Sequence, residues 1–224
     1  MGEAIGAVLA FAVGVGISPV PLIAVILMLF SNRARVNGPM FLAGWVLGLA
    51  VVAGGAYLLA DAFGLGDGSD GAQTGVSWLK LALGVLLGVA GIGKWRSRPG
   101  DGEEPTMPAW MSRVDGFSPP KALGLAVALS ANPKNLLLAV GAGSSLAQLA
   151  LPGGQVAVGL AVFVLVGSAG VIASVGYDIL GGDRARQRLD RAKAWLTEHN
   201  GAVLAVLYLV FAAVLISQSL GRQV

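Results

Sequence analysis

Asn132-Pro133-Lys134-Asn135 interrupts residues 122–150, a stretch that otherwise has the apolar composition of a membrane span. A lysine at the centre of a span costs about 2.5–3.5 kcal/mol on insertion scales. The proline has no backbone N–H, so the carbonyl of Leu129 loses its helical partner. Because irregular backbone at membrane depth is tolerated only within protein or beside a wet cavity, we expect a broken helix with a functional site at the break.

A second interruption, Ser18-Pro19-Val20-Pro21, lies 114 positions earlier, within the apolar stretch 4–30. Two interrupted spans in corresponding positions are typical of transporters built from two inverted halves. Pro39, which we expect to begin the second span, and Pro152, which precedes the fifth, have almost the same offset. Coincidence is the alternative explanation, because proline and glycine are common in membrane helices.

The composition indicates a polytopic membrane protein. Of 224 residues, 55% are hydrophobic and 12% are charged, whereas soluble domains carry about 25% charged residues, and the mean hydropathy is +0.76. The chain has no cysteine and one histidine, His199, which leaves little material for catalysis or metal binding. We therefore expect no enzyme activity, no metal and no cofactor. The charges cluster in loops, which indicates membrane topology rather than nucleic-acid binding.

Glycine spacings that would let helices pack closely occur at Gly44 and Gly48, Gly84 and Gly88, and Gly167 and Gly170.

Six apolar segments reach the length of a membrane span: 4–30, 39–60, 76–95, 121–149, 154–180 and 201–220. The loops after the first, third and fifth segments are basic, and the loops after the second and fourth are acidic or uncharged. The positive-inside rule then places the basic loops in the cytoplasm and both termini outside. With three spans in each half, the second half enters the bilayer from the opposite side, as an inverted repeat requires.

The fold class predicted is an all-α membrane protein of six transmembrane helices, arranged as two inverted-topology three-helix repeats with broken helices 1 and 4. Residues 1–95 form the first repeat and residues 121–224 the second. A cytoplasmic linker, 96–120, joins them, with Trp110, Met111 and Phe117 as interfacial anchors. Residues 184–199 predict an amphipathic helix on the cytoplasmic leaflet, with a solvated basic linker as the alternative. Its apolar face would comprise Ala185, Leu189, Ala192, Trp195 and Leu196.

In an inverted repeat the two breaks would face each other near the bilayer midplane. The carbonyls of Val15, Ile17 and Leu129 would lose their partners, and free N–H groups would lie near Leu22 and Leu136. Helix N-termini and the charge of a lysine favour an anion, such as a carboxylate, sulfate or phosphate. The candidate substrate-binding residues are Ser18, Pro19, Pro21, Asn132, Pro133, Lys134 and Asn135.

Three of these assignments have structural alternatives. Lys134 either lines the site or caps carbonyls of the opposite break, and snorkelling is hard from the middle of a span. Ser18 either binds substrate or caps its own half-helix. Asp178 is the acid best placed for proton coupling, or it marks a helix end.

The motifs together resemble a known family. They are Ile17-Ser18-Pro19-Val20-Pro21 and Phe41-Leu42-Ala43-Gly44-Trp45 in the first half, Pro108-Ala109-Trp110-Met111 in the middle, and Asn132-Pro133-Lys134-Asn135-Leu136 in the second half. Over almost its whole length, the chain resembles the actinobacterial GAP family, the glycopeptidolipid- and sulfolipid-addressing, Sap-like proteins of the LysE exporter superfamily.

The resemblance implies six spans in two inverted halves in the inner (plasma) membrane, and export of an anionic lipid or glycolipid towards the cell envelope. It assigns the motif positions at the two breaks to the substrate site. The expected partners are membrane lipids, the lipid substrate, a larger lipid-export machine and further copies of the chain. Two alternatives stay open: a LysE-type exporter of amino acids or small polar solutes, and a non-transporting assembly factor for a lipid-export machine.

Overall fold

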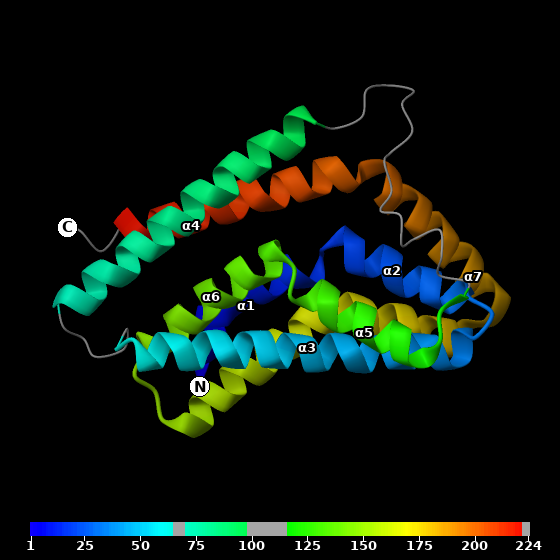
Figure 1. Ribbon diagram of the computed structural model, residues 1–224, viewed down its shortest axis with the longest axis horizontal. Helices are drawn as coiled ribbons and strands as arrows, with labels where there is room; N and C mark the ends of the chain where they lie inside the picture. Colours follow the sequence, from blue (N-terminus) through cyan, green and yellow to red (C-terminus); the bar gives the residue numbers. More distant parts are fainter. Residues whose placement is uncertain (65–69, 98–115, 221–224) are drawn as a thin grey trace.

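Prolines and glycines determine where the helices begin, bend and pack. The computed structural model describes residues 1–64, 70–97 and 116–220, and over these residues it is helical with no strand, which confirms the all-α class (Figure 1). In chain order the helices are α1 (Gly2–Gly16), α2 (Pro19–Phe30), α3 (Ala34–Ala62), α4 (Asp70–Arg96), α5 (Pro119–Ser130), α6 (Pro133–Ala147) and α7 (Gly153–Leu220).

Both predicted interruptions are breaks between helices. α1 and α2 meet at an angle of 54°, and α5 and α6 at 59°. Pro19 and Pro133 each stand in the first turn of the second helix of a pair, where the missing N–H costs nothing. Within the described residues, four helical segments are long and apolar enough to cross a membrane, and six candidate spans result if each bent pair counts as one. The chain is therefore a membrane protein.

The prediction that Pro39 begins the second span is wrong. α3 starts at Ala34 and continues through Pro39. A proline inside a helix removes one hydrogen bond, here the one to the carbonyl of Arg35. This carbonyl lies within the first turn of α3, so the loss falls close to the helix end and the helix persists.

After Gly153 the chain forms two helical parts, together labelled α7, that meet at a kink. α7 contains one kink, at Gly182, with φ 55° and ψ −144°, a conformation open to glycine. After the kink, the helix runs without interruption through residues 184–199 into the last candidate span. Ala185 and Leu189 of the expected apolar face are buried, whereas Trp195 is exposed. Of the expected linker, residues 98–115, with Trp110, Met111 and the Pro108–Met111 motif, lie outside the described residues.

The basic segments lie together at one end of the molecule. Figure 1 shows the α2–α3 turn, the start of α5 and the kink of α7 at the right-hand end. The N-terminus and the α6–α7 connection lie at the opposite end, where the Met1 ammonium donates to Gln155 Oε1 at 3.0 Å. We call the first of these the basic end, defined by Arg33, Arg35, Lys121, Arg184 and Arg186.

Glycines allow the central helices to approach at backbone distance. A Cβ at Gly44 of α3 would meet the carbonyl oxygen of Leu123 in α5. A Cβ at Gly16 of α1 would lie 2.7 Å from the carbonyl oxygen of Val166 in α7. α3 packs across α5 and α6, and α7 packs across α1 and α2. The predicted close approach at Gly44 is therefore confirmed, and small residues replace side-chain interdigitation at these crossings.

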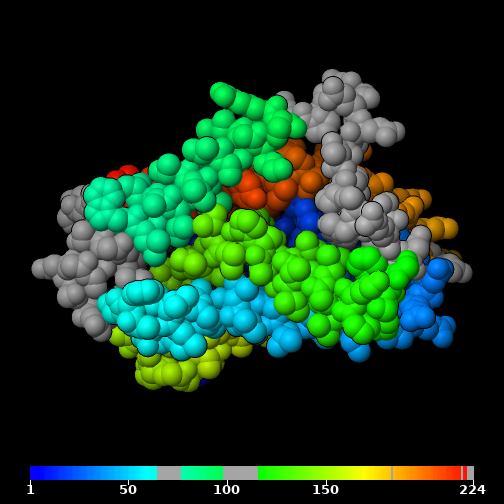
Figure 2. Space-filling model, in the orientation of Figure 1, coloured from blue at the N-terminus to red at the C-terminus, as the bar shows by residue number. Residues whose placement is uncertain are grey.

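α4 forms an antiparallel pair with the last part of α7. Gly84 lies against Ile216, and Gly91 lies against Leu209. Figure 1 shows this pair to one side of the other helices. An apolar hollow of about 700 Å³ runs along α4, lined by residues that include Trp78, Val85 and Val89, and Figure 2 shows α4 as a ridge beside α6.

Candidate functional site

The second break is closed by its own asparagines. Asn132, the N-cap of α6, accepts a hydrogen bond through Oδ1 from the backbone N–H of Asn135 at 3.0 Å. The Leu129 carbonyl accepts from Asn132 Nδ2 at 2.7 Å and from Asn135 Nδ2 at 3.2 Å. The short amide side chains thus supply the partners that Pro133 removed.

Two expectations about free backbone groups at this break are therefore wrong. The Leu129 carbonyl has new partners, and the N–H of Leu136 donates to the carbonyl of Asn132 at 3.0 Å. The cause is the same in both cases, because buried backbone groups in a bilayer find partners wherever a nearby side chain or carbonyl reaches them.

Lys134 reaches across to the other break. Its Nζ donates to the carbonyl oxygen of Gly14 in α1 at 2.7 Å, and the residue is 5% exposed. Gly14 is a free acceptor because the N–H of Ser18, which a continuing helix would direct to it, donates to Val15 instead, at 3.1 Å. The prediction that the Val15 carbonyl is free is therefore wrong, because this carbonyl accepts from the Ser18 N–H. The carbonyl that lacks a helical partner is that of Gly14. This contact is of the capping kind weighed as the structural alternative for Lys134.

Ser18 does not cap its own half-helix. It is the N-cap residue of α2, is 3% exposed, and makes no side-chain cap hydrogen bond. Pro19 and Pro21 have no N–H, so in the first three positions of α2 Val20 alone carries a donor. An N-cap side chain usually accepts from the second or third helical amide, and Pro21 removes the second of these two donors.

Two buried polar atoms near the breaks have no hydrogen-bond partner within the described chain. They are Asn135 Oδ1 and Ser168 Oγ, both in residues that are 0% exposed. Ser168 of α7 lies between Gly167, which contacts Val15, and Gly170, which contacts the carbonyl of Gly16. Buried polar groups are normally paired, so unused hydrogen-bonding capacity at this level is what a polar ligand or water would occupy.

Aromatic rings close one side of the breaks. Phe11 of α1 and Phe211 of α7 stack with ring centroids 6.3 Å apart. A Cβ at Gly14 would run into the ring of Phe211, and one at Gly141 of α6 would lie 2.6 Å from Phe11. We call Phe11 and Phe211 the aromatic seal. α1 packs along α6 on this side, whereas α2 and α5 touch only weakly on the side of the basic end.

The sequence did not indicate Gly14, Ser168, Phe11 or Phe211 as members of the site. Gly14 contributes a backbone atom, and the two phenylalanines are indistinguishable in sequence from other apolar residues of a span. A serine in a span is a weak signal that could have drawn attention to Ser168.

Asp178 lies away from the breaks. It pairs with Arg186 at 3.4 Å across the kink of α7 and is ten residues beyond Ser168, or about 15 Å along the helix. Among the described residues, no ion pair includes Lys134, and no cluster of acidic or histidine side chains could hold a metal ion. The charge of Lys134 is therefore balanced in the described chain by a backbone dipole alone.

Comparison with known proteins identifies one family. A family model described as "Sap, sulfolipid-1-addressing protein" matches residues 8–221, nearly the entire chain. No curated protein and no solved structure matches the chain. The match includes both breaks, the aromatic seal and the kink of α7. The chain thus belongs to the family of the sulfolipid-1-addressing protein, Sap.

Proposed function

We propose that this protein is a multi-pass transporter of the inner membrane, of LysE type, that exports an anionic lipid or glycolipid towards the cell envelope. The family description supports a lipid as the substrate class. The proposal includes no catalytic step. The substrate headgroup passes a midplane site at the two breaks, and the halves move around this site in alternating access.

The observation that carries the proposal is the bond from Lys134 to the Gly14 carbonyl. Lys134 stands in the first turn of α6, where its charge is repelled by the positive end of the helix dipole. Burial of the ammonium group costs further free energy. Stability alone does not favour a lysine here, whereas an anionic headgroup would gain from the lysine and the helix end together.

The contact also joins the two halves of the chain through one hydrogen bond. An anion that binds Lys134 competes with the carbonyl of Gly14 for the ammonium protons. An anion offers the ammonium group a full negative charge, whereas the carbonyl offers only a dipole, so a headgroup would displace the carbonyl. Loss of this bond would weaken the contact between α1 and α6, and would so couple binding to separation of the halves.

The packing of the helices supports an inverted repeat. The crossing of α3 over α5 and α6 corresponds to the crossing of α7 over α1 and α2. The pairs α1–α6 and α2–α5 would be equivalent under such symmetry, yet the first is close and the second loose. We infer a state closed at the aromatic seal and open towards the basic end, which we place in the cytoplasm with both termini outside.

A lipid also needs an apolar path for its chains. The hollow along α4 offers an apolar surface continuous with the bilayer, with Trp78, Val85 and Val89 exposed. In the proposed cycle, acyl chains stay in this hollow while the headgroup crosses at the breaks. An exporter of small polar solutes would need a polar path enclosed on all sides.

The test is lipid transfer by the purified protein. Liposomes of phosphatidylcholine carry a trace of fluorescent NBD-phosphatidylglycerol or NBD-phosphatidylcholine, and dithionite bleaches probe in the outer leaflet. The assay is run with and without an imposed pH gradient. We expect transfer of the phosphatidylglycerol probe, reduced about tenfold or more by Lys134→Met, as expected for loss of a charge-assisted bond worth about 1.5–3 kcal/mol.

Lys80→Met is the matched control. Lys80 is 4% exposed, donates to Gln148 at 3.3 Å, and lies in α4 outside the two breaks. We expect this variant to transfer the probe within about twofold of the wild-type rate. Folded protein that transfers neither probe would overturn the proposal and favour an assembly factor. Efflux of loaded amino acids without lipid transfer would favour the solute exporter.

A further inference from the structure

A hollow at the basic end lies apart from the two breaks. It has a volume of about 630 Å³ between the end of α2, the start of α3 and the kink of α7. Leu29, which lines it, is ten residues beyond Pro19, or about 15 Å along α2. Its lining also includes Ala34, Arg35, Asp178, Gly182 and Arg186.

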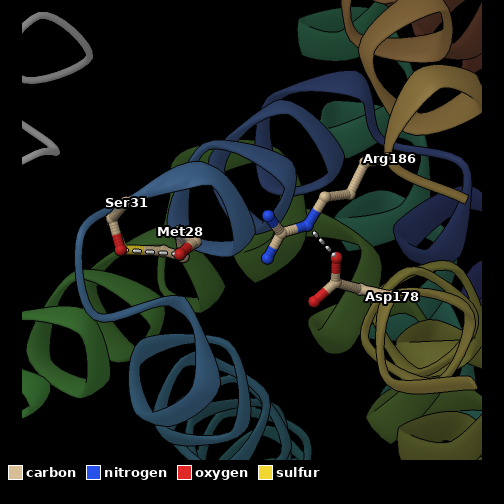
Figure 3. Close-up of polar contacts among 4 residues, drawn as sticks. All are labelled: Met28, Ser31, Asp178 and Arg186. Carbon is tan, nitrogen blue, oxygen red and sulfur yellow. Dashed lines mark hydrogen bonds and ion pairs between the residues drawn. The ribbon is translucent and has the colours of Figure 1, made fainter. Parts of the chain in front are cut away.

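Two guanidinium groups in this hollow have unused donors. Arg35 is exposed and forms no ion pair within the described residues. Arg186 donates through Nε to Asp178 Oδ1, and Figure 3 shows its two terminal nitrogens directed away from Asp178. A guanidinium presents its donors in a fork that matches the oxygens of a phosphate or sulfate group.

The existing ion pair leaves part of Arg186 free. Asp178 and Arg186 are 3.4 Å apart, with the Arg186 side chain 52% exposed and the Asp178 side chain 10% exposed. Because separating a mostly buried carboxylate from its partner is costly, an anion would accept from the terminal nitrogens of Arg186 and leave its Nε bonded to Asp178.

The backbone next to the hollow also favours an anion. α3 begins at Ala34, so the positive end of its dipole faces this region. The negative end of α2 is partly neutralised, because the Met28 carbonyl accepts from Ser31 Oγ at 2.7 Å and from Ser31 N–H at 3.3 Å (Figure 3). Asn37 fixes this turn by donating to Ser31 Oγ and to the Phe117 carbonyl, each at 3.0 Å.

The remaining wall is apolar. Leu29, Ala34 and Pro39 supply apolar parts of the lining. A site that combines arginines with aliphatic surface fits the phosphate or sulfate ester of a lipid, whose first carbons would contact Leu29 and Pro39. A free inorganic anion would use the arginines alone.

We propose that this hollow is a second anion-binding site, which takes a phosphate or sulfate ester group between Arg35 and Arg186. A bound group would connect α3 to the part of α7 after Gly182, and so brace the kink. The site is independent of Lys134 and loads anionic ligand at the basic end.

The test measures binding to the full-length protein in a neutral detergent by isothermal titration calorimetry. The probes are dihexanoyl phosphatidylglycerol, dihexanoyl phosphatidylcholine and sodium sulfate. We expect phosphatidylglycerol to bind in preference to phosphatidylcholine. Arg35→Gln with Arg186→Gln should weaken that binding about tenfold or more, and Asp178→Asn should strengthen it about threefold.

The control removes the same charge from the same face of the membrane. Arg184→Gln with Arg191→Gln changes two exposed arginines that do not line the hollow, and should weaken binding less than about threefold.

Lys134→Met should leave this binding intact even where lipid transfer is lost, which separates the two proposals. Sulfate binding that depends on Arg35 and Arg186 would assign the site to free anions as well as lipids. Equal losses in the two double variants, or no binding of either anionic probe, would overturn the site.

Discussion

At the scale of single residues, the second break divides its polar side chains between two tasks. Asn132 and Asn135 turn back to their own broken helix, and Lys134 turns to the opposite one. Both asparagines donate to the Leu129 carbonyl, whose helical partner Pro133 removed. Because the local needs of the break are met by neutral amides, the ammonium group is available to the other half of the chain.

The capping bond of Asn132 predicts a loss of stability when it is removed. Asn132→Ala should lower the free energy of unfolding by about 1 kcal/mol, because the Asn135 N–H loses its acceptor. Thermal unfolding in detergent would measure the difference. Ser118→Ala is the control, since Ser118 is the N-cap of α5 but makes no side-chain cap bond. Equal effects of the two substitutions would contradict the assignment.

Sequence reasoning finds Lys134 but not its partner. A lysine inside an apolar span is conspicuous, and its importance follows from the cost of burial. The Gly14 carbonyl becomes available only because the Ser18 N–H bonds to Val15. This one-residue shift in hydrogen bonding depends on the last turn of α1, which the pattern of side chains does not encode.

At the scale of helices, glycines decide which elements touch. Gly44→Ala should destabilise the protein by about 1–3 kcal/mol, because its Cβ would meet the backbone of Leu123, which cannot rotate away. Gly54→Ala in the same helix meets nothing within 4 Å and should be neutral or slightly stabilising. Denaturation in mixed micelles would compare the two. A neutral Gly44→Ala would mean that α3 and α5 are not in backbone contact.

The kink of α7 has a conformational requirement of its own. Gly182 has a positive φ that costs a residue with a Cβ about 1–3 kcal/mol. Gly182→Ala should therefore lower thermal stability, and Gly176→Ala, six residues earlier with nothing near its Cβ, should not. An unchanged melting temperature for Gly182→Ala would show that the kink is absent in the membrane.

Element boundaries were predictable where a breaker interrupts an apolar run and not where it stands near an end. Pro19 and Pro133 divide their spans as expected, but Pro39 is accommodated inside α3. Pro39 follows only five helical residues, so the hydrogen bond that it removes lies in the first turn of α3. Pro19 and Pro133 each follow a full helix, and nearby groups replace the hydrogen bonds lost at these two breaks. The kink at Gly182 lies close to the predicted end of the fifth span at residue 180, whereas the continuity of residues 184–199 with the last span was not predictable from the sequence.

At the scale of the whole molecule, the basic segments at one end predict a fixed orientation in the bilayer. The chain has no cysteine, so a thiol reagent would label only a cysteine introduced by substitution. A membrane-impermeant maleimide should label Arg184→Cys from the cytoplasm only and Gly153→Cys from the outside only. Labelling of both from one side would contradict a membrane crossing by residues 153–182.

Much of the overall arrangement follows from the spacing of the two breaks and the alternation of charge. The asymmetry between the close pair α1–α6 and the loose pair α2–α5 does not, because in the proposed cycle it belongs to one of two states. The proposed cycle requires one sequence to fit both states, and Phe11 and Phe211 would be apolar residues of a span in either one.

The acceptor for Lys134 belongs to the main chain, and this has a consequence for genetics. Every amino acid has a carbonyl oxygen, so a substitution at position 14 keeps the acceptor of this bond. Residue 14 is constrained instead by the ring of Phe211, which a Cβ would meet, and not by the identity of residue 134. The two positions should therefore vary without correlation across related genes, and a suppressor screen against Lys134 variants should recover residues that move the end of α1 rather than residue 14 itself.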